Sequence, residues 1–404
     1  MSIASRRTLL KSGIALAAGC IARPGLAIDI PGSGAMLNLH DRLTSPVRLE
    51  AIDQLRIGDA IWMRVRSTDG DTGYCPGNDR LDVTVALAKQ LVIPFFLGKD
   101  ARDIERLVDG VYTEHDRRGS VYKFAGMPFW NVVAHVEVAI FDLRGKLAGR
   151  PVCELLGERR REAIDVYISQ FGRETTAEQE VENARRDLEQ SGARATKLKI
   201  GLRMANSPAQ TRRDRRIIEL ARKTLGDHIT IYVDANGSYT RDEAVEMGRF
   251  LNAHGVRLFE EPLPWQDYRG TRDVTRSLQD LPIQVAGGEQ DSSLWQWGEM
   301  TEQRIVDIVR TFIGPVPGSI GGFVRSLRVA QMAAAAGMQF TPHSPTVLPR
   351  AAAHLHLCAV VPNLGPFQEY RASGEVTAGR VAVPTGEGLG LQVDARQLEQ
   401  GQAL

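Results

Sequence analysis

The chain has 404 residues, which is enough for a barrel of about 250 residues and a smaller second domain. Its 50 Lys and Arg residues balance 49 Asp and Glu residues, and the net charge of +1 gives no indication of nucleic acid or of a strongly acidic partner. No segment after the first 27 residues is long and apolar enough to span a bilayer, so we expect a soluble mature chain without a transmembrane span.

Residues 1–27 have the features of an export signal. Twin arginines, Arg6 and Arg7, precede a short apolar run, and the GLA sequence at 25–27 offers a cleavage site. This pattern resembles a twin-arginine signal, which would carry a folded protein to the periplasm. Two alternatives stay open, a lipoprotein anchor at Cys20 and an uncleaved basic terminus. The three other cysteines are too few and too scattered for a disulfide framework or a zinc site.

Residues 28–160 are predicted to form a small α+β domain. A strand-like segment at 61–70 is followed by a turn over 70–79 and by a helical pattern over 83–98. The sequence shows no internal repeat in this region and no low-complexity segment. A compact domain ahead of the longer second part is therefore expected.

Residues 161–371 alternate short apolar runs with longer helical stretches, as in repeating β/α units. Asp234, Glu260 and Glu289 each stand at the end of such a run and lie 26 and 29 positions apart, enough for one strand, one helix and two loops. A single acidic residue after a strand is usually a helix cap or a loop residue. If the runs are successive strands of one barrel, however, the three carboxylates converge, and hard oxygen ligands suit Mg²⁺.

The strand before this acidic set contains Lys197 and Lys199, which lie two residues apart and so on one face of the strand. Like charges depress each other's pKa, and a lysine with a lowered pKa can act as a base near neutral pH. A solvent-facing edge strand is the alternative. Further along the chain, His343 in TPHSPT and Glu369 in FQEY each follow an apolar stretch.

This ordered set of residues resembles the enolase superfamily, specifically the mandelate racemase and muconate lactonising enzyme branch. The resemblance runs from about residue 36 to about residue 371, and the segment AHVEVAIFDLRGKLAGRPVCELLG is similar to the family's link between domains. It implies an α/β fold, a TIM-like (β/α)₇β barrel with an α+β N-terminal capping domain. It also implies that Asp234, Glu260 and Glu289 hold Mg²⁺, with Mn²⁺ as an alternative, and that the chain forms a homo-oligomer.

The resemblance further implies a small-molecule carboxylate substrate that loses the proton next to its carboxylate. Lys199 would face the α-carbon as the base, Lys197 would lie nearer the carboxylate, and His343 would exchange a proton on the other side. Asn236, Gln290 and Glu369 would orient the ligands or contact substrate, although Asn236 and Gln290 could also be turn residues.

We expect dehydration of a sugar acid to a 2-keto-3-deoxy acid. A racemase, an epimerase or a cycloisomerase of a hydroxy acid or sugar-acid lactone is the alternative. A non-catalytic exported protein that binds carboxylates is the second alternative. The sequence does not name the acid.

The sixth strand departs from the family pattern. Where an Asp or a Lys usually stands, the segment VDIVRTFIG places Phe312, and a shift of the alignment stays open. Asp307 is expected at the far end of the barrel, and Arg310, which is a poor base, could bind a carboxylate instead. Without an Asp behind it, His343 is expected to be less readily held as an imidazolium.

The loops of the capping domain at 72–80 and 111–130 are expected to close over the barrel mouth and select the substrate. The first loop could carry Tyr74 or Asn78 to the substrate, or both could be turn residues. Residues 372–404 are expected to pack back on the capping domain.

Overall fold

The computed structural model describes residues 31–32, 36–37, 40, 43–114, 121–310, 320–391 and 395–404. The whole of the proposed export signal, residues 1–27 with Arg6, Arg7 and Cys20, lies outside the described residues and stays a prediction. Phe312 also lies outside them. Within the described ranges, no helix combines the length and the hydropathy that a membrane crossing requires.

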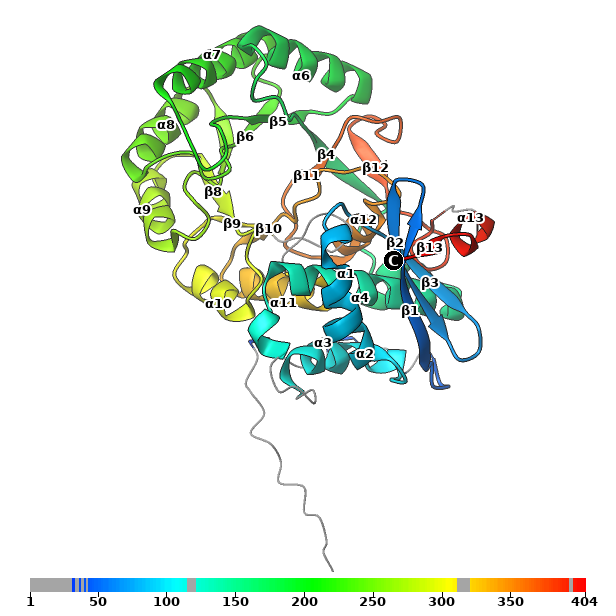
Figure 1. The fold of residues 1–404 in the computed structure, drawn as a ribbon. Helices are drawn as coiled ribbons and strands as arrows, with labels where there is room; N and C mark the ends of the chain where they lie inside the picture. The colour runs from blue at the N-terminus through cyan, green and yellow to red at the C-terminus, as the bar shows by residue number, and fades with distance from the viewer. Residues whose placement is uncertain are drawn as a thin grey trace, which may run out of the picture.

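The predicted barrel and its separate α+β domain are confirmed (Figure 1). Eight strands pair side by side in parallel, in the order of the chain. They are β4 (Ala163–Ser169), β5 (Ala195–Lys199), β6 (Thr230–Asp234), β7 (Val256–Glu260), β8 (Gln284–Gly287), β9 (Ile308–Val309), β10 (Gln339–Phe340) and β11 (Gln368–Tyr370). The ring closes between β10 and β11, where the backbone N–H of Phe340 donates to Asn363 and that of Gly365 donates to Phe340.

Helices follow the strands and form an arc outside them in Figure 1. They are α6 (Ala177–Ser191), α7 (Pro208–Leu225), α8 (Arg241–Ala253), α9 (Tyr268–Leu278), α10 (Leu294–Glu302), α11 (Gly322–Ala335) and α12 (Ala352–Val360). Helices α6 and α8 each begin with a capping box, in which a Thr and the residue three positions later exchange hydrogen bonds. These sequence signals set where the helices begin.

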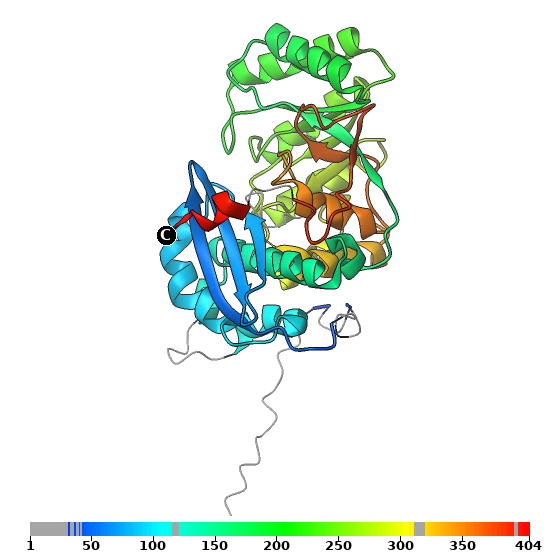
Figure 2. The same cartoon turned by 90° about the vertical axis from the view of Figure 1, so that its right-hand side faces the viewer.

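The capping domain contains an antiparallel sheet of four strands, in the order β13-β1-β2-β3. The strands are β1 (Leu49–Ile57), β2 (Ala60–Ser67), β3 (Thr72–Pro76) and β13 (Gln402–Ala403). The segment at 70–79 was expected to be a turn, but β3 occupies half of it and pairs with β2. Figure 2 shows α13 (Ala395–Glu399), close to the C-terminus, beside this sheet.

Short elements complete the structure. They are α1 (Val85–Leu87), α2 (Ile93–Phe96), α3 (Ile104–Thr113), α5 (Val152–Leu156), β12 (Arg380–Ala382), the 3₁₀ turns Asp82–Thr84, Ala101–Asp103 and Val121–Phe124, and the π-helical turn Ala88–Val92.

Helix α4 (Met127–Ala148) joins the two domains. Every residue from 129 to 145 is buried, because α4 packs on β2 and β3 on one side and on α11 of the barrel on the other. At Gly73 a Cβ would lie 2.1 Å from the carbonyl oxygen of Ala139, so only glycine lets β3 approach the helix this closely. The helix therefore fixes the capping domain against the barrel.

Strand alternation divides the barrel interior into layers. Tyr167, Ala195, Tyr232, Leu258, Ala286 and Ile308 form an apolar layer inside the barrel. Two residues further along several of these strands, at the carboxyl ends, the inward positions are charged. The barrel thus has a packed floor and a charged mouth.

Glu137 of α4 is buried against the start of α11. Its Oε1 accepts a hydrogen bond from the backbone N–H of Val324 at 2.8 Å. Burial raises the pKa of Glu137 to about 8, although hydrogen bonds and the nearby Arg325 and Arg328 oppose this change. The folded chain therefore holds a proton on Glu137 at pH values where the unfolded chain has lost it.

We expect the Glu137→Gln variant to lose part of the pH dependence of stability. Between the ordinary pKa of a glutamate and about 8, the folded state binds more protons than the unfolded state at this site. The free energy of unfolding should therefore fall as pH rises, by up to about 1.4 kcal/mol per pH unit. Urea unfolding at pH 5 and pH 8 measures this change. The exposed Glu219→Gln control should keep the wild-type slope, and an equal slope in Glu137→Gln would contradict the assignment.

Candidate active site

The register of the parallel strands brings the predicted residues into one row. Lys199 of β5 lies opposite Asp234 of β6, and Asp234 lies opposite Glu260 of β7. Glu260 in turn lies opposite Ala286 of β8, and Glu289 follows three residues later. The sequence prediction that these side chains meet at the carboxyl ends of successive strands therefore agrees with the geometry.

Lys197 is fully buried and lies between carboxylates. Its Nζ is 2.7 Å from Oε2 of Glu260, 2.8 Å from Oε1 of Glu369 and 3.6 Å from Oδ2 of Asp234. Burial alone would lower the pKa of Lys197, but Glu260 and Glu369 outweigh it and hold the pKa well above its ordinary value. We expected the neighbouring lysines to lower each other's pKa. This expectation is wrong for Lys197, because the attraction of the two close carboxylates raises its pKa.

Lys199 lies nearer the mouth of the barrel. Its Nζ forms an ion pair with Oδ2 of Asp234 and lies 3.5 Å from Oδ1 of Asn236. Its side chain keeps 5% of its surface exposed, whereas that of Lys197 keeps none. Of the two lysines, Lys199 is therefore the one that a bound molecule can reach.

Arg310 takes the inward position at the end of β9. Its Nε forms an ion pair with Oε1 of Glu260, and its Nη2 lies 3.0 Å from Oε2 of Glu369 and 2.9 Å from the Tyr167 hydroxyl. A buried cation thus stands at the end of the sixth barrel strand, two residues before Phe312. Arg310 binds carboxylates of its own chain, and Asp307 points elsewhere, since it accepts a hydrogen bond from the backbone N–H of Val285.

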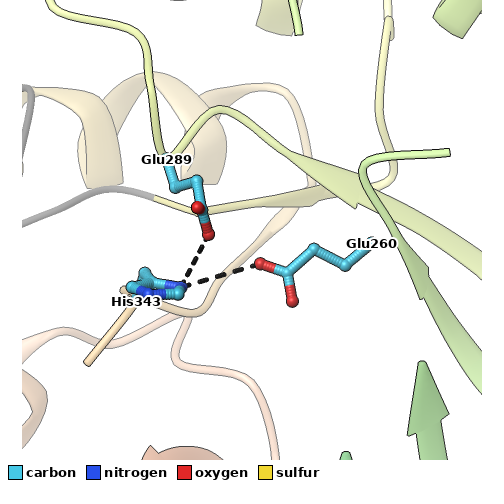
Figure 3. A group of neighbouring side chains, drawn as sticks. All are labelled: Glu260, Glu289 and His343. Atoms are coloured by element: carbon cyan, nitrogen blue, oxygen red, sulfur yellow. Dashed lines mark ion pairs between the residues drawn. The ribbon is translucent and has the colours of Figure 1, made fainter. Parts of the chain in front are cut away.

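His343, on the loop after β10, contacts three carboxylates, and Figure 3 shows two of them, those of Glu260 and Glu289. Its Nδ1 lies 2.7 Å from Oε2 of Glu289, 3.0 Å from Oε2 of Glu369 and 3.8 Å from Oε1 of Glu260. Burial would lower the pKa of His343, but Glu289 and Glu369 raise it above its ordinary value. His343 was expected to hold its second proton less readily without an Asp on the sixth strand. This expectation is wrong, because acidic residues from other strands contact the ring and raise its pKa.

Glu369 belongs to this buried network. Arg371, two residues further along the chain, lies over the Phe171 ring, 4.7 Å from its centroid. Lys197, Arg310 and His343 surround Glu369 instead, and they hold its pKa well below the ordinary value in spite of burial.

Asn236 and Gln290 lie beside the predicted ligands. The backbone N–H of Asn236 donates to Oδ1 of Asp234 at 2.9 Å, and Nε2 of Gln290 donates to Oε1 of Glu289 at 3.0 Å. Nη2 of Arg173 donates to the Asn236 side chain. Both predicted residues therefore hold carboxylates in place, and both side chains also line the cavity above the site.

The residues fit a divalent cation. Asp234, Glu260 and Glu289 are buried and offer carboxylate oxygens, the ligand type that Mg²⁺ prefers. Ligand atoms of Glu260, Glu289 and His343 lie within 4.8 Å of one another. Asp234 lies outside this group and is paired with Lys199. His343 and Lys199 therefore supply the positive charge at the two ends of the acidic row.

A cavity of 390 Å³ opens above these residues. Its wall includes Lys199, Asn236, Glu289, Gln290 and His343 from the prediction, together with Arg80, Phe171, Arg203, Met204, Glu261, Trp265 and Pro345. The seven additional residues lie on loops, where sequence patterns give little guidance to position.

Neither Tyr74 nor Asn78 lines this cavity. Tyr74 packs with Leu55, Trp62 and Leu398 in the capping domain, and Asn78 is buried. Arg80, from the same loop, reaches the cavity instead.

Comparisons with known proteins agree with this geometry. A family model described as "Enolase C-terminal domain-like" matches residues 179–397. The arabinonate dehydratase of Saccharolobus solfataricus is 28% identical over 81% of this chain and 87% of its own. The L-talarate/galactarate dehydratase of Salmonella typhimurium is 30% identical over 75% and 73%. The D-galactarolactone cycloisomerase of Agrobacterium fabrum is 25% identical over 84% and 90%.

Solved structures show the same fold. A candidate racemase from Roseobacter denitrificans superposes with a TM-score of 0.79 at 32% identity, covering 88% of this chain and 99% of its own. A mandelate racemase/muconate lactonizing protein from Paracoccus denitrificans, solved in complex with magnesium, gives a TM-score of 0.79 at 23% identity, covering 89% and 99%.

The buried cation Arg310 should be important for stability. We expect Arg310→Met to lower the free energy of unfolding by about 3–5 kcal/mol, because Glu260 and Glu369 would lose a buried partner. Arg241→Met, at an exposed pair with Asp273, should change it by less than about 0.5 kcal/mol. Urea unfolding with EDTA present measures the free energy of both variants. A loss below about 1 kcal/mol for Arg310→Met would show that Lys197 alone is enough to stabilise the buried Glu260 and Glu369.

The affinity for Mg²⁺ distinguishes the proposed metal ligand Asp234 from the nearby His343. We expect Asp234→Asn to weaken Mg²⁺ binding by at least about tenfold, since a charged oxygen ligand is lost, and His343→Asn to leave binding intact or stronger. Isothermal titration calorimetry measures both variants. The reverse order of effects would assign the metal to Glu260, Glu289 and His343.

Proposed function

This chain belongs to the enolase C-terminal domain-like family, in the mandelate racemase and muconate lactonising branch, and we propose that it dehydrates a sugar acid. The reaction removes the proton α to a carboxylate and expels the β-hydroxyl as water, which yields a 2-keto-3-deoxy acid. One observation carries the proposal. Two side chains capable of proton transfer, Lys199 and His343, line the same cavity directly above the row of buried carboxylates.

The two proton transfers take place in separate steps, the first at Lys199 and the second at His343. The amine of Lys199 takes the α-proton, and the electron pair of that C–H bond moves into the substrate carboxylate. That charge then returns to form the new C=C bond as the β C–O bond breaks. The imidazolium of His343 gives its proton to the departing hydroxyl, so that water leaves. The resulting enol takes up a proton at C3, loses the proton of its C2 hydroxyl and becomes the ketone. The paired carboxylates of Asp234 and Glu289 orient these two groups.

The intermediate of this reaction carries extra negative charge on the substrate carboxylate. Mg²⁺ held by Asp234, Glu260 and Glu289 would supply positive charge to that carboxylate. Lys197 supports the same charge from below, since its buried ammonium stays protonated. Glu369 holds Lys197, Arg310 and His343 together.

A cycloisomerisation is the second candidate. The Agrobacterium relative that acts on a galactarolactone matches 84% of this chain at 25% identity. The same Lys199 and His343 would then serve ring opening instead of loss of water. The type of product distinguishes the two reactions.

We expect the mature protein with Mg²⁺ to form a 3-deoxy-2-keto product from one or more acids in a panel of aldonic, uronic and aldaric acids and their lactones, observed by proton NMR in D₂O. Lys199→Ala should lower turnover on the order of 10²- to 10⁴-fold, because the base is lost, while Mg²⁺ still binds. EDTA should abolish turnover, and added Mg²⁺ should restore it.

The exposed Lys223→Ala variant is the matched control and should keep wild-type turnover. Full activity of Lys199→Ala would refute the base assignment. Exchange of the α-proton without loss of water would favour racemisation, and a rearranged lactone would select the cycloisomerase. No reaction across the panel, with acids and Mg²⁺ both bound, would indicate a non-catalytic binding protein.

A further inference from the structure

Two arginines on the cavity wall have side chains that form no ion pair with another described residue. Arg80 comes from the capping domain, and Arg203 comes from the loop after β5. Among the described residues, the hydrogen-bond acceptor of the Arg80 guanidinium is the thioether of Met127, 3.1 Å from Nη1, and no carboxylate lies within ion-pair distance of it. A thioether is a weak acceptor, so Arg80 keeps most of its capacity to bind an anion.

The backbone around Arg80 is held in place. Nδ2 of Asn78 donates to Oδ1 of Asn131 on α4 at 2.7 Å, and the backbone N–H of Arg80 donates to Oδ1 of Asn78 at 2.9 Å. The backbone N–H of Gly77 also donates to Ile61 of β2. Because α4 is itself packed against the barrel, this loop presents Arg80 to the cavity in a preorganised position.

Two of the basic side chains on the cavity wall are paired with carboxylates of the metal site. Lys199 is paired with Asp234, and His343 is paired with Glu289. Within the described part of the wall, neither Arg80 nor Arg203 has such a partner, and both belong to loops at the mouth rather than to the row of carboxylates. The mouth therefore favours an anionic group on the end of the substrate that lies farthest from the reacting carboxylate.

We propose that Arg80 binds a second carboxylate at the distal end of the substrate, so that the preferred substrate is a sugar diacid of the aldaric type. This inference rests on the proposed function and specifies its substrate class. A guanidinium presents parallel N–H donors that match a carboxylate in bidentate geometry. Arg203 adds positive charge to the same mouth. A diacid places its reacting carboxylate at the metal site and its distal carboxylate at Arg80.

The test compares acids that differ only at the distal end. The wild-type protein with Mg²⁺ is assayed on pairs of matched configuration, galactarate with galactonate and glucarate with gluconate. We expect the wild-type kcat/KM to favour the diacid of at least one pair by about 10-fold or more. Arg80→Met should reduce this preference by about 10- to 100-fold, the range for loss of one charge-assisted pair, and Arg80→Lys should restore part of it.

Arg241→Met on the surface of α8 is the control and should keep the wild-type preference. A structural defect in Arg80→Met would lower both members of a pair alike, so the ratio reports recognition. Calorimetric binding of the same pairs in the Lys199→Ala background gives a second readout that does not depend on turnover.

The outcomes separate this inference from the proposed function. Turnover of monoacids with equal or better efficiency than their diacids would overturn the diacid assignment and leave the dehydratase standing. If the Arg203→Met variant lost the preference for diacids and the Arg80→Met variant kept it, the role of Arg80 would be overturned. Turnover of a phosphorylated monoacid alone would also overturn it. No turnover and no proton exchange with any acid would overturn both proposals.

Discussion

The site depends on four fully buried charges in the barrel mouth, those of Lys197, Arg310, Glu260 and Glu369. Removing any one of these groups from water costs several kcal/mol, and only close mutual pairing offsets that cost. Each cation contacts both carboxylates, so the four side chains fix one another without exposed partners. The groups that face the cavity are built on this unit, since His343 contacts Glu369 and Glu260 from above. A rigid charged layer thus lies between the apolar floor and the cavity.

Much of the fold could be predicted because it depends on local patterns. Strand alternation and the spacing of Asp234, Glu260 and Glu289 are properties of single segments, and parallel register converts them into a row. The sixth strand resisted prediction because β9 has only two residues, too few to show alternation. Arg310 was considered as a carboxylate ligand, but its partners are supplied by β7 and β11. These partners lie far from Arg310 in the sequence, so the pattern of the sixth strand alone does not identify them.

The charge states show the same limit. Lys197 and Lys199 are close in sequence, and from that proximity a mutual lowering of pKa follows. In space, however, Glu260 and Glu369 lie against Lys197 and raise its pKa. His343 likewise lost an expected partner on the sixth strand and gained others from the fifth and eighth. A pKa depends on the neighbours of a group in three dimensions. The residues proposed to distinguish substrates, such as Arg80, lie on loops, which have no periodic sequence pattern.

The pairing of β13 with β1 has a consequence for how the chain folds. Leu55 pairs with Ala403, so the sheet that begins the folded chain is completed by some of its last residues. Contacts between such distant segments form late, because a very long loop must close first. The barrel has mostly neighbouring strands and can assemble earlier. The capping domain, which carries Arg80, therefore acquires its full sheet only once the tail is in place, and recognition at the mouth should be the last property that the folding chain gains.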